Sequence, residues 1–150
     1  MADATDILMS MVEENWNHVR HSEDQRATIT NLIVIVVSII QGVLTQTGFT
    51  KNALPLTFLL IILGLYGVVT TAKLHERSRF HIKRARKLRE RLDILCPDAQ
   101  IKLLQQVADE EHRSQHPILA KKVRLSSLWL TLHGLFAILG TVYTIVILVR

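Results

Sequence analysis

Long uncharged stretches alternate with strongly polar ones along this chain. Three windows contain no Asp, Glu, Lys or Arg, and they are 24, 21 and 25 residues long. They lie between Arg26 and Lys51, between Lys51 and Lys73, and between Arg124 and Arg150. Because roughly 20 mostly apolar residues of helix cross the hydrocarbon core of a bilayer, each window is long enough to span a membrane. We therefore predict an all-α integral membrane protein with three transmembrane helices, at residues 28–46, 54–72 and 125–149.

A soluble helical bundle is the alternative explanation of these windows. The overall share of hydrophobic residues, 49%, would suit a soluble protein as well. A helix buried in a soluble core usually keeps one polar stripe, however, and the run LTFLLIILGLYGVV shows almost none. The clustering of the apolar residues, and not their number, favours the membrane.

The first 27 residues have the pattern of an amphipathic helix. Apolar side chains recur at helical spacing, at Ile7, Leu8, Met11, Val12, Trp16 and Val19. This cytoplasmic helix (1–27) can lie on the membrane surface or continue into the first span. Its acidic residues favour packing against a basic helix over adsorption to anionic lipid. Residues 47–53 form a short external loop, so the first two spans are expected to make a tight hairpin.

The segment 73–124 is the most basic part of the chain. Between Lys73 and Leu95 there are nine of the eighteen Lys and Arg residues and no Pro or Gly, which predicts a helix continuous with the second span. One face of this helix carries a seam at steps of four and three, formed by Leu74, Ser78, His81, Ala85, Leu88, Leu92 and Leu95. Cys96-Pro97 ends the helix. One extra short cytoplasmic helix follows, and it is expected to bury Ile101, Leu104 and Val107 or Ala108.

The distribution of Lys and Arg predicts the orientation of the chain. Fourteen of them lie in 73–124 and two more in the N-terminal segment, whereas only Lys51 and Arg150 would lie outside. Because cytoplasmic loops carry the excess of Lys and Arg, we predict a multi-pass protein of the cytoplasmic (inner) membrane. Its N-terminus is cytoplasmic and its C-terminus external. The acidic start MADATDILMSMVEENW does not have the pattern of a signal peptide.

The first span contains an unusual number of polar side chains on one helix face, namely Asn31, Ser38, Gln41 and Thr45. Polar side chains inside a membrane must face protein or water, because lipid cannot hydrogen-bond to them. The stripe can therefore bond to neighbouring helices or line an aqueous pathway. A pore requires several subunits, since one stripe per subunit cannot enclose a channel. We therefore expect a homo-oligomer.

The basic helix supplies the candidate residues for receiving a signal, which are Arg79, Lys83, Arg86 and Lys87. A cluster of this kind can serve as a topology signal with a solvated face and attract anionic lipid at about 1 kcal/mol per residue. It can also bind a phosphate-bearing ligand such as a nucleotide, or an acidic cytoplasmic protein. No Gly-rich phosphate loop and no interleaved aromatic residues accompany it, so nucleic acid is not an expected partner.

Small residues in the second and third spans are candidates for close helix packing, within one subunit or between subunits. They are Gly64 and Gly67 in the second span and Gly134, Ala137, Thr141 and Thr144 in the third. His133 lies inside the third span. It is expected to be a neutral, hydrogen-bonded side chain, with a gating or proton-transfer role as the alternative.

Catalytic and metal-binding signals are weak. His112 and His116 are four residues apart where a helix ends at Pro117, and Glu14, His18 and His21 share a face of a helix on which such residues are common. Neither set predicts a metal site. No nucleophile elbow, zincin motif or pair of catalytic carboxylates is present. We expect no enzyme activity and no cofactor.

The order of elements resembles a known family. The polar stretch NWNHVRHSEDQRATITN, the transmembrane hairpin and the basic helix RFHIKRARKLRERLDIL together resemble the SLATT-type membrane effectors of bacterial conflict systems, over roughly residues 10–96. The third span is an addition to that pattern. In this family a two-helix membrane unit is thought to form pores or perturb the membrane after a nucleotide-synthesising or sensing partner detects infection.

The resemblance implies a homo-oligomeric bacterial membrane effector of antiphage defence that permeabilises the membrane when its cytoplasmic helices receive a signal. The alternative is a non-conducting scaffold subunit that anchors in the bilayer and docks a cytoplasmic partner through its basic helices. A subunit that transports a lipid or ligand is a third interpretation.

Overall fold

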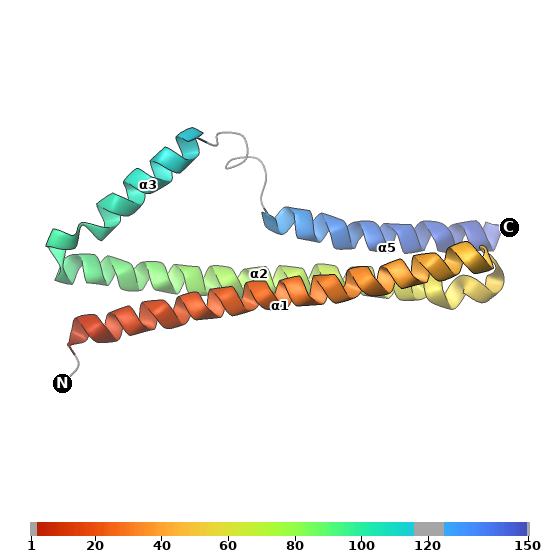
Figure 1. Ribbon diagram of the computed structural model, residues 1–150, viewed down its shortest axis with the longest axis horizontal. Coiled ribbons are helices and arrows are strands. Elements are labelled where there is room, and N and C mark those ends of the chain that lie inside the picture. The colour runs from red at the N-terminus through yellow and green to blue at the C-terminus, as the bar shows by residue number, and fades with distance from the viewer. Residues whose placement is uncertain (1–2, 116–124, 150) are drawn as a thin grey trace. The chain divides into compact units, whose positions relative to one another are not determined.

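The computed structural model describes residues 3–115 and 125–149. All of its elements are helical: α1 (Ala4–Thr47), the short 3-10 helix η1 (Lys51–Ala53), α2 (Leu54–Leu95), the 3-10 helix η2 (Pro97–Ala99), α3 (Ile101–Gln115) and α5 (Leu125–Val149) (Figure 1). Three of them, α1, α2 and α5, contain a stretch long and apolar enough to cross a membrane. For the described residues, the prediction of an all-helical chain with three such helices is confirmed. The predicted approach to the third span, with its basic residues Lys121, Lys122 and Arg124, lies outside the described residues, as do His116 and Arg150.

The two long helices run without a break from polar into apolar sequence. In α1 no Pro or Gly occurs before Gly42, so the amphipathic segment continues directly into the first apolar stretch. The single proline of α2 is Pro55, in its first turn, where a missing backbone N–H does no harm. Gly48, at φ +73°, follows the end of α1 in the left-handed conformation that ends many helices. Of the two arrangements considered for the N-terminal segment, the structure therefore shows the one in which its helix continues into the first apolar stretch.

The contacts divide the chain into two units, and α1 and α2 each contribute to both. The described residues of the first unit are 3–23 and 75–115, which we call the basic unit. Those of the second are 24–74 and 125–149, which we call the apolar unit.

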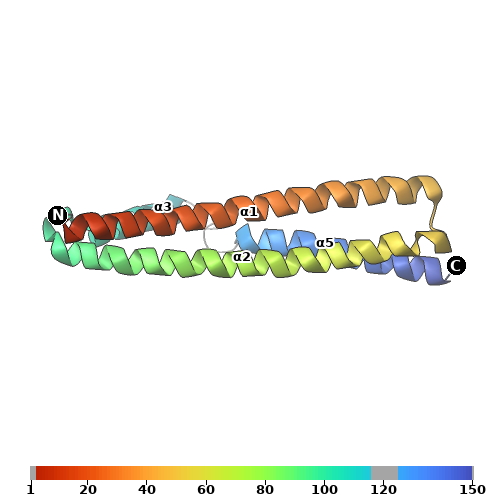
Figure 2. The same cartoon turned by 90° about the horizontal axis from the view of Figure 1, so that it is seen from below.

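The apolar unit is built from three helices around a narrow core. Buried side chains of α1 recur at steps of four and three, and the core consists of Ile33, Val37, Ile40, Leu44, Ala53, Leu60 and Ile147. Within this unit α5 lies alongside α1 and α2 (Figures 1 and 2). Many large apolar side chains face outward instead, among them Leu32, Ile35, Ile39, Ile62, Val69 and Ile145. An outer surface of this kind suits lipid as the surroundings.

In the basic unit, the N-terminal half of α1 packs against the C-terminal half of α2. The predicted seam of α2 faces this contact, with Ser78, His81, Ala85 and Leu92 buried. Their buried neighbours on α1 are Asn15, Val19 and Ser22. The last seam residue, Leu95, is exposed.

The predicted burial of α3 is wrong. Leu104 is 64% exposed and Val107 is 55% exposed, Ile101 is half-buried, and no described residue of α3 is fully buried. The hollow between α2 and α3 is lined on the α3 side mainly by polar residues, including Lys102, Gln105 and Asp109. The polar side of α3 therefore faces α2, and much of its apolar face is left without a partner within the described chain.

Candidate functional site

The polar stripe predicted for the first span lies mostly on an outward face of α1. Asn31, Ser38 and Thr45 are seven residues apart and exposed, whereas Gln41 is half-buried at the edge of this face. The Ser38 hydroxyl donates to the carbonyl of Val34 (2.8 Å), and the Thr45 hydroxyl to that of Gln41 (2.7 Å). These hydroxyls are satisfied within their own helix. The amide of Asn31 has no such bond to another described residue, so it is the member of the stripe most in need of an external partner.

Polar pairs inside the apolar unit join α5 to the other two helices. The Thr30 hydroxyl lies 3.1 Å from Nε2 of His133, and the Thr144 hydroxyl donates to that of Thr57 at 2.8 Å. The phenol of Tyr143 donates to Gln41 at 3.0 Å. Sequence patterns could not identify these pairs, because the partners are 87 to 103 residues apart along the chain.

His133 is fully buried, with 0% of its surface exposed. Its second ring nitrogen, Nδ1, has no hydrogen-bond partner among the described residues. Gly67 of α2 lies against the ring so closely that an added Cβ would meet the imidazole. The His133 ring thus occupies space that is open only because residue 67 has no side chain. This close packing and the contact with Thr30 agree with a buried, hydrogen-bonded structural histidine.

The small residues of the second and third spans are placed in two groups. Gly64 lies directly against the backbone of Ala137, and Gly140 of α5 lies against Leu60 and Ile61, where an added Cβ would meet atoms at 2.9 Å. In contrast, nothing lies within 4 Å of the Cβ position of Gly134, and Thr141 is exposed with its hydroxyl bonded to Ala137. The contact surface of α5 within the subunit is therefore offset from the predicted one and contains His133, Ala137, Gly140 and Thr144. Gly134 and Thr141 lie outside this contact surface.

A buried layer of polar side chains interrupts the seam of the basic unit. Nδ1 of His81 lies 3.0 Å from Oδ1 of Asn15, whose amide nitrogen donates to the Met11 carbonyl. The ring of His18 stacks on that of His81 with centroids 4.6 Å apart. Burial lowers the pKa of His81, and nearby His18, Arg77 and Arg84 lower it further, whereas Glu14 acts in the opposite direction. His81 is therefore held neutral, with Nδ1–H donating to Asn15.

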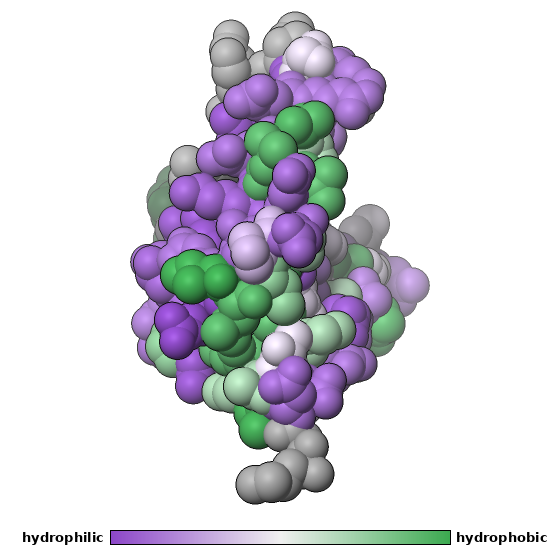
Figure 3. Space-filling model, turned by 90° about the vertical axis from the view of Figure 1, so that its left-hand side faces the viewer, coloured by the Kyte–Doolittle hydropathy of each residue, from purple (hydrophilic) through white to green (hydrophobic). Residues whose placement is uncertain are grey.

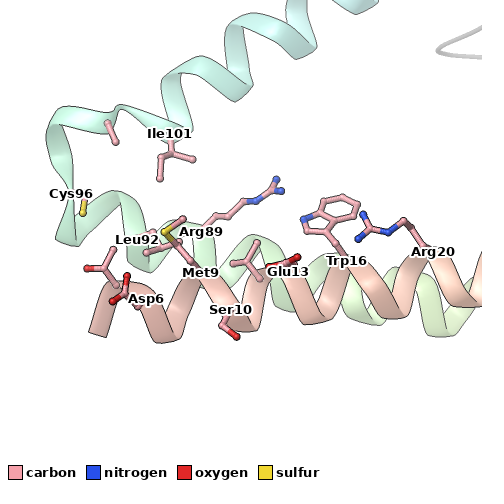
Figure 4. A pocket seen from close by; sticks show the side chains of 13 residues that line it. Asp6, Met9, Ser10, Glu13, Trp16, Arg20, Arg89, Leu92, Cys96 and Ile101 are labelled. Atoms are coloured by element: carbon pink, nitrogen blue, oxygen red, sulfur yellow. The ribbon is translucent and has the colours of Figure 1, made fainter. Parts of the chain in front are cut away.

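A large hollow lies in the basic unit. Its volume is about 980 Å³, and residues of α1, α2, η2 and α3 line it, including Asp6, Met9, Trp16, Arg89, Leu92 and Ile101 (Figure 4). The guanidinium of Arg89 lies over the indole of Trp16 at 5.0 Å from the ring centroid. Arg89 could not be distinguished from the other cations of α2 by the sequence alone. What distinguishes it is its contact with Trp16, which depends on the packing of α1 against α2.

A second hollow, of about 310 Å³, lies between α2 and α3. Four cationic side chains and two carboxylates line it together with two glutamines: Arg86, Arg89, Lys102, Arg113, Glu90, Asp109, Gln105 and Gln106. The hydrogen bond from Lys87 is the main cause of the lowered pKa of Glu90. Of the four predicted signal-receiving residues, Arg86 lines this hollow. Arg79, Lys83 and Lys87 are exposed on α2 and line none of the described hollows.

Comparison with protein-family models, with curated proteins and with solved structures gives no match for this chain. The class of protein is therefore inferred from the length and composition of the helices alone. Three of them are long and apolar enough to cross a membrane, as in a multi-pass membrane protein. Among the described residues, no three His, Cys, Asp or Glu side chains come together as metal ligands would.

Proposed function

We propose that this protein is a homo-oligomeric effector of the bacterial inner membrane that makes the membrane permeable when its cytoplasmic helices receive a signal. The observation that carries the proposal is the outward stripe of Asn31, Ser38 and Thr45, because the other exposed residues of α1 between positions 31 and 45 are apolar. The Asn31 amide facing lipid is unfavourable, whereas the same amide facing its copies around an aqueous path is not. The Ser38 and Thr45 hydroxyls donate within α1, and their oxygens can still accept hydrogen bonds from water along such a path. Closed cyclic symmetry is the usual arrangement of such repeated contacts.

The orientation of the chain supports the proposed direction of signalling. Sixteen Lys and Arg residues on one side and two on the other favour a basic unit in the cytoplasm. The resemblance to SLATT-type effectors over roughly residues 10–96 agrees with this arrangement and suggests a role in antiphage defence.

The α2–α3 hollow is the place where we expect the signal to bind. Arg86, Arg89, Lys102 and Arg113 can pair with a phosphate-bearing ligand or with an acidic peptide of a partner protein. A ligand acts as a signal only if it binds one state of the protein better than another. Because α2 runs without a break from this hollow into the apolar unit, a change at one end of the helix can reach the other.

Leakage experiments test the proposal most directly. Replacing Asn31, Ser38 and Thr45 by leucine should remove dye leakage from proteoliposomes or expressing cells while membrane insertion and oligomer mass stay unchanged. The matched control changes the exposed apolar residues Ile35 and Ile39 of the same helix to leucine and should leak like the parent protein. Leakage that persists at the parent level in the leucine stripe variant would contradict a conducting path along this stripe.

The scaffold alternative is favoured by one observation of its own. The Thr30–His133, Thr57–Thr144 and Gln41–Tyr143 pairs bond polar groups within the subunit, so only part of the polar content of the spans needs a further partner. A scaffold of this kind would never leak, with or without a signal, and would still capture a cytoplasmic partner through the basic unit. Leakage measurements on the parent protein therefore separate the two functions.

A further inference from the structure

The outward face of α3 is apolar at its start and acidic near its end. Leu104 and Val107 line none of the described hollows and stand exposed, and they are followed by Glu110 and Glu111. The side of α3 that faces its own α2 is instead the polar one, with Lys102, Gln105 and Asp109. Figure 3 looks onto the end of the molecule where this unit lies and shows hydrophobic side chains gathered between hydrophilic ones. An amphipathic helix with its apolar side outward needs something to cover that side.

The outward face of α2 in the same unit carries exposed apolar and basic side chains, which are complementary to the apolar and acidic face of α3. Phe80 and Ile94 are 55% and 68% exposed and lie fourteen residues apart, so they fall on nearly the same face of the helix. Between them on that face stand the exposed cations Lys83, Arg84, Lys87 and Arg91. The stretch contains two acidic residues: Glu90 is bonded to Lys87 at 2.8 Å, and Asp93 accepts a hydrogen bond from the backbone N–H of Lys102 at 3.2 Å.

We propose that α3 of one subunit docks on this outward face of α2 in a second copy of the same chain. Leu104 and Val107 would cover Ile94 and the hydrocarbon stem of Arg91, and Glu110 and Glu111 would pair with the cations from Lys83 to Lys87. The opposite charges of the two faces exclude α3 docking on α3 or α2 docking on α2, where like charges would meet. The proposal rests on the homo-oligomer of the proposed function and assigns its cytoplasmic interface.

The spacing of the two faces agrees with this pairing. From Leu104 to Glu111 is one heptad, and from Ile94 back to Lys87 is also one heptad, or about 10 Å of helix at 1.5 Å per residue. Because only five residues separate the end of α2 from the start of α3, and the chain turns back there, the first turn of α3 begins near the level of Ile94. Subunits related by an axis along the membrane normal hold their α2 helices at the same height. An α3 that leans outward would therefore meet the neighbouring α2 in this register.

A bilayer surface is a less suitable occupant for the face of α3. Two carboxylates stand at its end, and the cytoplasmic leaflet carries negative charge that would repel them. The basic face of α2 supplies the charge that lipid lacks. Docking onto the α2 of the same chain would bring the other side of α3, the one lined by Lys102 and Gln105, against the helix.

Cross-linking between differently tagged subunits tests the docking. In a full-length protein with Cys96→Ser, one subunit carries Leu104→Cys and the co-expressed subunit carries Ile94→Cys with a different tag. We expect an oxidative cross-link that contains both tags. The matched control places the cysteine of α3 on its opposite side, as Gln106→Cys, and should give at least about tenfold less product because that side faces its own α2. Absence of the two-tag product in a protein that is oligomeric by mass would overturn the docking and leave the proposed function standing.

Charge exchange supplies a second test that does not depend on cysteine chemistry. Glu110→Lys with Glu111→Lys should reduce the fraction of oligomer at a fixed protein concentration by about tenfold, because like charges then meet across the interface. Lys83→Glu with Lys87→Glu should do the same. All four changes in one chain should restore the oligomer, and far-ultraviolet circular dichroism shows that each variant is folded. If the combined variant stays as dissociated as the single pairs, or if neither pair dissociates the oligomer, the proposed contact is wrong.

Discussion

At the scale of single residues, the apolar unit depends on positions where α5 approaches α2 too closely for any side chain. Gly64 lies against the backbone of Ala137, which cannot move aside as the end of a flexible side chain can. Gly67 leaves room for the His133 ring, whose Nε2 lies next to the Thr30 hydroxyl on α1. The buried histidine and the glycine beside it are therefore one packing feature shared by three helices.

Replacing Gly64 by alanine should destabilise the apolar unit. The added methyl group would collide with the Ala137 backbone, and overpacking of this kind costs about 1–3 kcal/mol. Denaturation of the purified protein in detergent, followed by circular dichroism, would measure the loss. Gly134→Ala is the matched control on the facing helix, since nothing lies within 4 Å of its added Cβ. Equal stability of the two variants would contradict the close approach of α2 and α5.

The basic unit should become less stable as the pH falls. The pKa of His81 is lowered in the folded state by burial first and then by His18, Arg77 and Arg84, with Glu14 opposing them. The unfolded chain, with a histidine pKa of about 6.5, therefore takes up a proton before the folded chain does. Stability is fully present above the unfolded pKa and is lost as the pH falls from there through the folded pKa.

Hydrogen exchange of the α2 amides around His81, compared between about pH 7.5 and about pH 5 after correction for intrinsic exchange, would measure this effect. His81→Gln, which can still donate to Asn15, should lose most of the pH dependence. His21→Gln, an exposed histidine of α1, should keep it. A parent protein whose protection is the same at both pH values would contradict the prediction.

At the scale of elements, the three long helices could be predicted from uncharged windows and from the positions of Pro and Gly. The seam of α2 could be predicted as well, and the polar side chain of His81 in this seam is explained by its contacts with Asn15 and His18 on α1. The orientation of α3 could not be predicted, because an amphipathic pattern shows which side is apolar but not what that side contacts. The offset of the α5 contact surface had the same cause. Candidate partners such as Thr30 and His133 are joined only by the tertiary fold.

A proline in α2 near the boundary of the two units should interrupt this helix without unfolding either unit. Ala72 is exposed on α2, so Ala72→Pro removes no buried contact but breaks one backbone hydrogen bond and costs roughly 3 kcal/mol in a helix interior. We expect amides just before residue 72 to exchange faster while both units keep their protection. If α2 transmits the signal as proposed, triggered leakage should also be lost. Ala72→Leu is the control, and a proline variant that leaks like this control would show that continuity of α2 is not needed.

At the scale of the whole molecule, the two proposed binding faces of the basic unit lie on opposite sides of one short helix, α3. The polar side completes the cationic hollow with Arg86 and Arg89, and the outward side carries Leu104, Val107 and the acidic pair. A ligand in the hollow and a neighbouring subunit on the outward face would both act on the position of α3. By linkage, a ligand that favours the docked position must strengthen the contact between subunits by the same factor that this contact strengthens ligand binding.

The orientation of the chain in the membrane can be tested with its single cysteine. Sixteen Lys and Arg residues lie on the side of Cys96 and two on the other, so Cys96 should be cytoplasmic. A membrane-impermeant maleimide should therefore label Cys96 only after intact cells are permeabilised. Thr50→Cys in a Cys96→Ser chain places the thiol in the exposed loop between α1 and α2 and should be labelled without permeabilisation. Labelling of Cys96 in intact cells, together with protection at position 50, would mean that the chain is inserted in the opposite orientation, and the basic unit could not then receive a cytoplasmic signal.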